Sequence, residues 1–183
     1  EGKQVARYLG AGLKSVPFGG FYTSDAGRQR ETMQIILQQT GREAVRPTEL
    51  TGLREVFFGS FEGSFNKEMA SAAAAQLGLP NAQALFAGMK AGTLSVERSI
   101  NAIAAADPAG QAENYQQVKA RTQAALRTII DNALREKQSN VLIISSGSAI
   151  QIMISDLTTD PEKNKPLANS AVVKIVYQNG KLT

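Results

Sequence analysis

The chain has 183 residues, with 20 Lys and Arg against 16 Asp and Glu, a formal charge of +4. Apolar residues make up 43%, enough for a sizeable core, and no run approaches the ~18 apolar residues that span a bilayer. The basic residues are scattered and not interleaved with aromatics, which favours an anionic small molecule over nucleic acid. We expect a soluble globular protein without a membrane span, and its location, cytoplasmic or secreted, stays open.

Two residue types are absent from the sequence. Without Cys there is no disulfide framework, thiol nucleophile or zinc–thiolate site. Without His the chain lacks the commonest general base and metal ligand. We therefore expect no metal and no other cofactor.

Helical spacing of Val, Ala and Leu predicts a first helix over residues 3–14, and an aromatic and β-branched run predicts a short strand over residues 20–23. Ser24 and Asp25 follow the strand and have the side chains that helix N-caps prefer. They are expected to begin a second helix over residues 27–39.

The second helix carries the first candidate binding residue, Arg28. The spacing predicts that Thr32, Ile35, Ile36 and Gln39 share its inner side, and Gly41 suits the position just after its end. Arg28 falls in the first turn, where the helix dipole disfavours a cation. An anionic partner would explain it, and the alternative is an ordinary solvated surface arginine.

A polar connection with one short strand near residues 44–45 leads to a loop over residues 53–63 that contains two acids. Glu55 and Glu62 stand beside aromatic residues, and the loop glycines indicate a constrained backbone. Burial beside aromatics raises a carboxyl pKa and suits it to general-acid work. The alternative is that both are exposed loop carboxylates.

An alanine-rich stretch, about residues 64–107, reads as short helices broken at Gly78 and Gly92. Its expected role is a helical insertion that caps a pocket, and plain packing is the alternative. Asp107 followed by Pro108 then predicts the start of a long amphipathic helix that ends near residue 137.

The stretch 140–150 reads as a strand, a tight turn and the start of a helix. Its uninterrupted apolar run predicts a buried strand covered on both faces, as in a parallel sheet. The turn lies at the carboxyl edge, where the backbone N–H groups of Gly147 and Ser148 could hold an anion. Residues 171–178 alternate as a strand, and Asn179 with Gly180 predicts a hairpin turn.

These elements predict a three-layer α/β/α fold with a mostly parallel central sheet, helices on both faces and a helical insertion. We expect residues 1–183 to form a single domain. The sequence starts without Met, its hairpin has a short return strand, and few strands are readable. We therefore expect a domain truncated at both ends.

Three segments together resemble the histidine phosphatase superfamily, also called phosphoglycerate mutase-like. Tyr22–Thr32 is similar to the family's strand, Ser-Asp turn, Arg and helical Thr. Leu53-Arg54-Glu55 through Gly59, Glu62 and Gly63 is similar to its acid-bearing loop, and Ile144-Ser145-Ser146-Gly147 stands where the family has Ser-His-Gly. Leu167-Ala168-Asn169-Ser170 before a strand is similar to the family's tail.

The resemblance implies a phosphoryl-transfer site in which one His takes the phosphoryl group, two Arg and a second His bind it, and an acid protonates the leaving oxygen. Arg28 matches a phosphate-binding Arg and Glu55 matches the general acid. Ser146 occupies the second His position, where it offers a hydroxyl but no imidazolium. The family's Arg-His-Gly segment would precede residue 1.

Three functions follow as alternatives. The first is a phosphomonoesterase fold that is inactive or impaired with the residues present, and the second is a pseudoenzyme that binds a phosphorylated ligand or another protein. The third is a phosphoglycerate mutase-like phosphotransferase, and a plain α/β scaffold is the remaining interpretation. The expected partner is a phosphorylated small molecule or phosphate ion, and a homodimer is one assembly to test.

Overall fold

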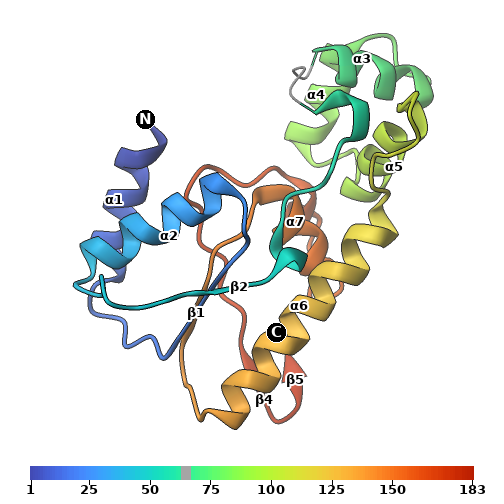
Figure 1. Ribbon diagram of the computed structural model, residues 1–183. Coiled ribbons are helices and arrows are strands. Elements are labelled where there is room, and N and C mark those ends of the chain that lie inside the picture. Colours follow the sequence, from blue (N-terminus) through green and yellow to red (C-terminus); the bar gives the residue numbers. More distant parts are fainter. Residues whose placement is uncertain (63–66) are drawn as a thin grey trace. The chain divides into compact units, whose positions relative to one another are not determined.

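The computed structural model describes residues 1–62 and 67–183, which group into two compact units (Figure 1). The first unit combines residues 1–54, 121–147 and 168–183. The second combines residues 55–120 and 148–167. Gly63 and the first residues of the expected insertion lie outside the described residues.

A parallel sheet of three short strands organises the first unit. Its strands are β1 (Gly20–Thr23), β2 (Thr48–Glu49) and β3 (Val141–Ile143), in the order β2-β1-β3. Tyr22 of β1 pairs with Thr48 on one side and Ile143 on the other. The carboxyl ends of all three strands therefore meet at one edge.

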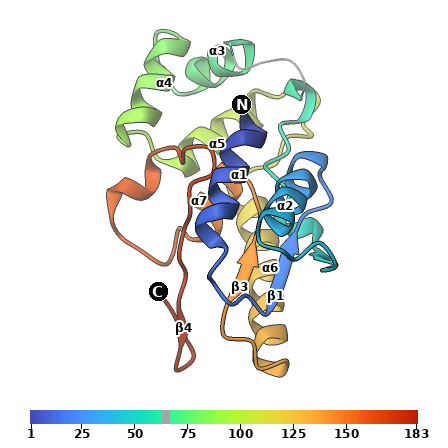
Figure 2. The same cartoon turned by 90° about the vertical axis from the view of Figure 1, so that its left-hand side faces the viewer.

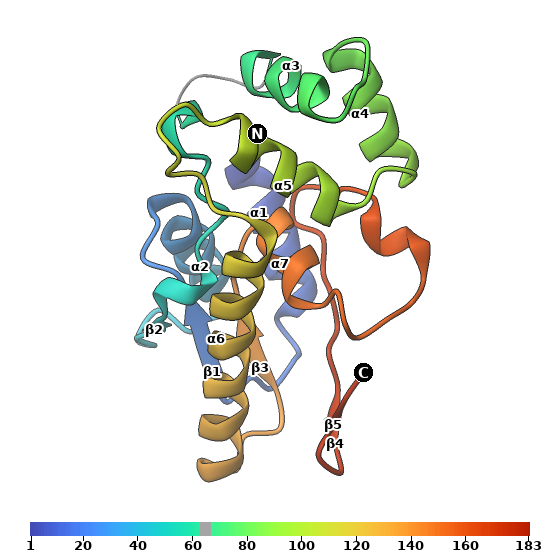
Figure 3. The ribbon, with the colours of Figure 1, turned by 90° about the vertical axis from the view of Figure 1, so that its right-hand side faces the viewer.

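Helices cover both faces of this sheet (Figures 2 and 3). On one face α1 (Gly2–Leu13) packs against α2 (Gly27–Gln39), and on the other lie residues 121–135 of α6 (Tyr115–Arg135). Asn132 Nδ2 of α6 donates a 3.1 Å hydrogen bond to the Tyr22 hydroxyl, which ties this helix to β1. The predicted α/β class, with helices on both faces of a parallel sheet, is confirmed.

The buried face of α2 differs from the predicted one. Its buried residues are Gln29, Met33, Ile35, Ile36 and Leu37, whereas Thr32 is half-buried and Gln39 is exposed. The predicted face was therefore rotated, because the polar Gln29 was not counted among the inner positions.

The predicted bounds of α2, residues 27–39, are confirmed, but its predicted N-cap is not. Gly41 adopts a left-handed conformation with φ of 68°, as expected after a helix end. At the start the N-cap is Ala26, and Ser24 Oγ accepts a 3.0 Å hydrogen bond from the Ala26 N–H. Ser24 and Asp25 as N-caps were wrong, because Ala26 is the residue directly before the first residue of the helix.

Two strand predictions need correction. The strand expected near residues 44–45 lies at Thr48–Glu49. The strand Val141–Ile143 is parallel as predicted but only half-buried, because it forms an edge of the described sheet. An apolar run therefore does not distinguish an edge strand from a central one.

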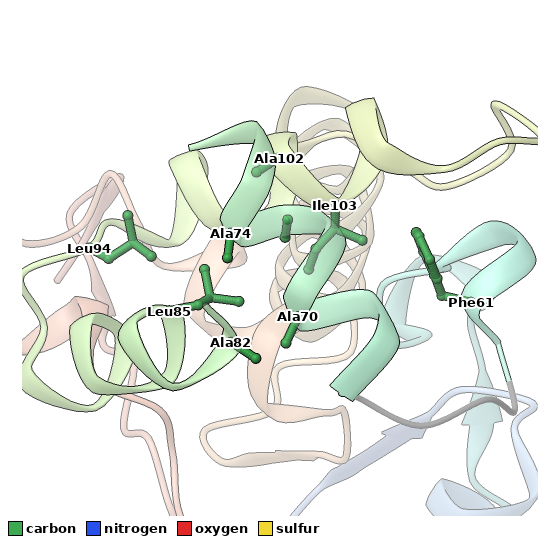
Figure 4. Close-up of a cluster of buried hydrophobic side chains, with 9 residues drawn as sticks. Phe61, Ala70, Ala74, Ala82, Leu85, Leu94, Ala102 and Ile103 are labelled. Atoms are coloured by element: carbon green, nitrogen blue, oxygen red, sulfur yellow. The ribbon is translucent and has the colours of Figure 1, made fainter. Parts of the chain in front are cut away.

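The second unit is mainly helical. It contains α3 (Lys67–Gln76), α4 (Ala82–Ala91), α5 (Val96–Ala106) and most of α7 (Gly147–Met153). The predicted short helices in the alanine-rich stretch are confirmed, with left-handed glycines at Gly78 and Gly92. Small side chains let α3 pack closely against α4 and α5 around Leu85 and Ile103 (Figure 4).

Asp107 does not begin the long helix. It ends α5, and α6 starts only at Tyr115. The buried Asp107 carboxylate instead bonds to the intervening loop and to the single turn of 3-10 helix at Gly59–Phe61. Gly59 has φ of 61°, and a Cβ there would overlap this carboxylate. Tertiary contacts thus overrode a local helix-start signal.

The predicted turn of the C-terminal hairpin is confirmed, but the long strand predicted before it is not. Strands β4 (Tyr177–Gln178) and β5 (Lys181–Leu182) are antiparallel and joined by Asn179 and Gly180, both at positive φ. Residues 171–176 are not assigned to a strand, and the hairpin forms a sheet of its own. Two further 3-10 turns lie at Thr51–Leu53 and Pro161–Asn164.

Within the described residues, no helix has the length and apolar character that crossing a membrane requires.

Candidate functional site

The turn after β3 is held in the first unit by hydrogen bonds that involve both of its serines. Ser145 Oγ donates to the Leu53 carbonyl at 2.8 Å. Ser146 Oγ accepts a 2.5 Å hydrogen bond from Gln29 Nε2 in the first turn of α2. This bond brings the segment that carries Arg28 to the turn that carries Ser146, so two predicted site segments meet.

Gln29 is a site residue that the sequence analysis missed. It is only 5% exposed, and its Oε1 has no hydrogen-bond partner among the described residues. The available signal was its spacing, because Gln29 precedes Met33 and Ile36 by four and seven positions on the buried face. A polar residue at such a position indicates a buried polar contact.

Arg28 is exposed, and no described residue forms a hydrogen bond or ion pair with its guanidinium. Neighbouring arginines differ: Arg54 forms a two-pronged ion pair with Asp25, at 2.7 and 2.5 Å. The hydrogen bonds from Arg54 lower the pKa of Asp25 to about 2. Arg30 is paired in the same way with Glu49. Arg28 is therefore available to an external anion.

Glu55 lies in the second unit, where its carboxylate binds backbone groups. Its Oε1 accepts hydrogen bonds from the N–H of Val56 at 2.9 Å and of Ala149 at 3.0 Å, the latter in α7. The structure thus fixes the Glu55 carboxylate at the first turn of α7. The other predicted acid, Glu62, is exposed and accepts from the Phe58 N–H.

The aromatic surroundings of the acid-bearing loop are mixed. Phe61 is buried, Phe58 is half-buried, and Phe57 is 44% exposed. The expectation of acids beside buried aromatics therefore does not apply to Glu62, which is exposed.

The predicted anion-binding backbone of Gly147 and Ser148 belongs to a short helix. Helix α7 has seven residues, and the N–H of Ala149 in its first turn already donates to Glu55. The helix terminus is therefore a weaker feature of the site than the Arg28 and Ser146 side chains.

A separate open cavity of about 350 Å³ lies in the first unit between α2, β2 and the connection before β2. Arg30, Arg46 and Glu49 line it, but Arg28 and Ser146 do not. Within the part of the chain that the structure describes, no cluster of three or more Asp, Glu, His or Cys side chains is arranged to hold a metal ion.

The fold and these residues define a class of protein: an α/β protein with a serine turn at the carboxyl ends of parallel strands and, beside it, an arginine that no described residue pairs with. This edge is the usual place for anionic ligands in such sheets. The chain belongs to the histidine phosphatase superfamily (branch 1), whose family model matches residues 1–84 and 90–183. The resemblance read from the sequence is confirmed.

Solved structures agree with this membership. Phosphoglycerate mutase from Bacillus anthracis is 32% identical, with a TM-score of 0.90 over 99% of this chain and 77% of that chain. The alpha-ribazole phosphatase from Shigella flexneri is 18% identical, with a TM-score of 0.65 over 99% of this chain and 78% of that one. A search among curated proteins finds no match.

A mycobacterial glucosyl-3-phosphoglycerate phosphatase, solved with inorganic phosphate, is 18% identical, with a TM-score of 0.62 over 92% of this chain and 74% of that one. At such identities the two phosphatases support the fold alone.

Proposed function

We propose that this protein binds the phosphate group of a phosphorylated small molecule, or phosphate ion, at the turn that follows β3. The observation that carries the proposal is the Gln29–Ser146 hydrogen bond, which joins that turn to the helical turn bearing Arg28. Because the Arg28 guanidinium has no partner among the described residues, it can donate hydrogen bonds to an incoming phosphate and balance its negative charge.

The chemistry of the proposed site is binding rather than covalent transfer. Arg28 offers two parallel N–H donors to phosphate oxygens, and Ser146 offers a hydroxyl in place of an imidazolium. Residues 1–183 contain no His, so no phosphohistidine can form on them. Glu55 is a candidate proton donor only where a nucleophile completes the site.

Replacing Arg28 tests the proposal directly. Arg28→Ala should weaken the binding of inorganic phosphate by about 10- to 150-fold, because a hydrogen-bonded charge contributes ~1.5–3 kcal/mol. Isothermal titration calorimetry of the purified protein measures this loss. The matched control is Arg127→Ala, which removes an equal charge from the exposed face of α6 and should leave affinity unchanged.

The assignment of Arg28 is wrong if Arg28→Ala binds phosphate as tightly as the wild-type protein. Equal losses in Arg28→Ala and Arg127→Ala would instead indicate a general charge effect without a defined pocket.

A second candidate function is phosphotransfer of the phosphoglycerate mutase type. The observation that favours it is the 32% identity to the Bacillus anthracis mutase over 99% of this chain. The helical stretch over residues 67–106 does not favour a phosphatase over a mutase, because the match to the mutase covers 99% of this chain. Assays of the full-length protein with 3-phosphoglycerate and with p-nitrophenyl phosphate separate the functions, since a pure binding protein turns over neither substrate.

A further inference from the structure

The Gln29–Ser146 hydrogen bond has a direction. Gln29 Nε2 is the donor and Ser146 Oγ is the acceptor, at 2.5 Å. A serine hydroxyl has a single hydrogen, so Ser146 must direct its own O–H elsewhere. None of the described residues accepts that hydrogen, and the Ser146 side chain is only partly buried. Ser146 is thus a hydrogen-bond donor with its hydrogen free.

The other end of the Gln29 amide has no partner. Gln29 is 5% exposed, and its buried Oε1 forms no hydrogen bond with the described residues. A buried acceptor without a partner lowers stability compared with an apolar side chain of the same shape. Stability alone therefore does not explain a glutamine at this position, whereas control of the Ser146 hydroxyl does.

We propose that Gln29 is a positioning residue that holds the Ser146 O–H towards an oxygen of the bound phosphate. This inference rests on the proposed function, because it requires phosphate to bind beside Ser146. Because Gln29 donates to the Ser146 oxygen, the hydroxyl hydrogen points away from Gln29 and can be donated to an anion, which has acceptors alone. The pair thus offers one oriented, neutral hydrogen bond at the position where the family resemblance implies a positively charged His.

The first test is Gln29→Met, which keeps the length of the side chain and removes both amide groups. We expect inorganic phosphate to bind about 2- to 10-fold more weakly by calorimetry, as for the loss of one oriented hydrogen bond. We also expect an unchanged or higher melting temperature, because the unpartnered acceptor is gone. Gln38→Met, on the exposed face of the same helix, is the matched control and should alter neither quantity.

Two further variants test the direction of the bond. Gln29→Glu places a carboxylate that would accept the Ser146 O–H and turn it away from the ligand, so phosphate should bind more weakly than to Gln29→Met. Ser146→Ala removes the hydroxyl itself. If Gln29 acts through Ser146, the double variant Gln29→Met/Ser146→Ala binds phosphate no more weakly than Ser146→Ala alone.

The results separate this inference from the proposed function. The inference is overturned if Gln29→Met binds phosphate with wild-type affinity. It is also overturned if Gln29→Met melts at a lower temperature or fails to fold, and no affinity loss depends on Ser146. In either case Gln29 is a structural residue. If Arg28→Ala still weakens binding in that case, the proposed function stands. If the wild-type protein binds no phosphate, the proposed function fails and the role of Gln29 fails with it.

Discussion

At the scale of single residues, Asp107 shows how one carboxylate can organise a loop. It accepts hydrogen bonds from the Ser60 hydroxyl and from the N–H groups of Ala109, Gln111 and Ala112, at 3.1, 2.7 and 2.8 Å for the three backbone donors. The hydrogen bond from Ser60, and to a smaller extent those from the backbone, hold the pKa of Asp107 well below its usual range, although burial opposes this. The ionised form is therefore the one that the fold needs.

Asp107→Asn should lower the melting temperature at pH 7, because one carboxylate oxygen becomes an NH₂ group that faces N–H donors. A lowered folded-state pKa stabilises the protein fully above the ordinary aspartate value of ~3.9, and this contribution is lost as the pH falls towards the folded-state value. The difference between wild type and variant should thus shrink below pH ~4. Thermal melts at pH 7 and pH 3 measure it.

The same substitution offers its own internal control. A pH-independent difference in melting temperature would mean that Asp107 acts through its shape and not through its charge.

At the scale of elements, alanine decides how closely the helices of the second unit pack. Ala70, Ala73 and Ala74 of α3 are at most 1% exposed and belong to the buried cluster that also contains residues of α4 and α5 (Figure 4). Small side chains let the helices approach closely, with Leu85 and Ile103 in the same buried cluster. The alanine-rich composition is therefore a packing device, and the helices need not carry any chemistry.

Ala74→Leu should destabilise the protein by about 1–3 kcal/mol, because extra methylenes in a filled core force neighbouring side chains apart. The neighbouring Ala75 is exposed on the same helix, so Ala75→Leu should change stability by less than ~0.5 kcal/mol. Urea unfolding monitored by circular dichroism measures both variants. Equal effects at the two positions would contradict the packing described for α3.

Elements with strong local signals were predictable, and those decided by distant contacts were not. The strand Gly20–Thr23 and the helix Gly27–Gln39 have the predicted bounds, because their signals lie within a few residues. The start of α6 was missed since Asp107 bonds to Ser60, 47 positions away. Local rules cannot anticipate such partners.

The candidate site was predictable in part for the same reason. Arg28, Glu55 and Ser146 came from three motifs in order along the chain, and the structure joins the Arg28 and Ser146 segments within the first unit. Gln29 was missed because the partner of its amide lies 117 positions away. The roles of Arg28, Glu55, Ser146, Gly147 and Ser148 stay predictions.

At the scale of the whole molecule, a phosphate site makes folding stability depend on ligand concentration. A ligand that binds only the folded state stabilises it by about 2.7 kcal/mol at one hundred times its Kd. The melting temperature of the wild-type protein should therefore rise with phosphate, whereas that of Arg28→Ala should rise far less. Thermal melts at constant ionic strength, balanced with sodium chloride, measure the difference.

Equal rises in the two proteins would mean that phosphate acts as an excluded salt and not as a bound ligand. A homodimer also stays a prediction at this scale, and the same samples can be tested for it by analytical ultracentrifugation.

The close contact between Gln29 and Ser146 also restricts how this sequence can change. An imidazole at position 146 that pointed the same way would overlap the Gln29 amide, which lies 2.5 Å from the Ser146 oxygen. We therefore expect Ser146→His to need a smaller residue at position 29 at the same time. We therefore expect the effects of substitutions at positions 29 and 146 to be coupled.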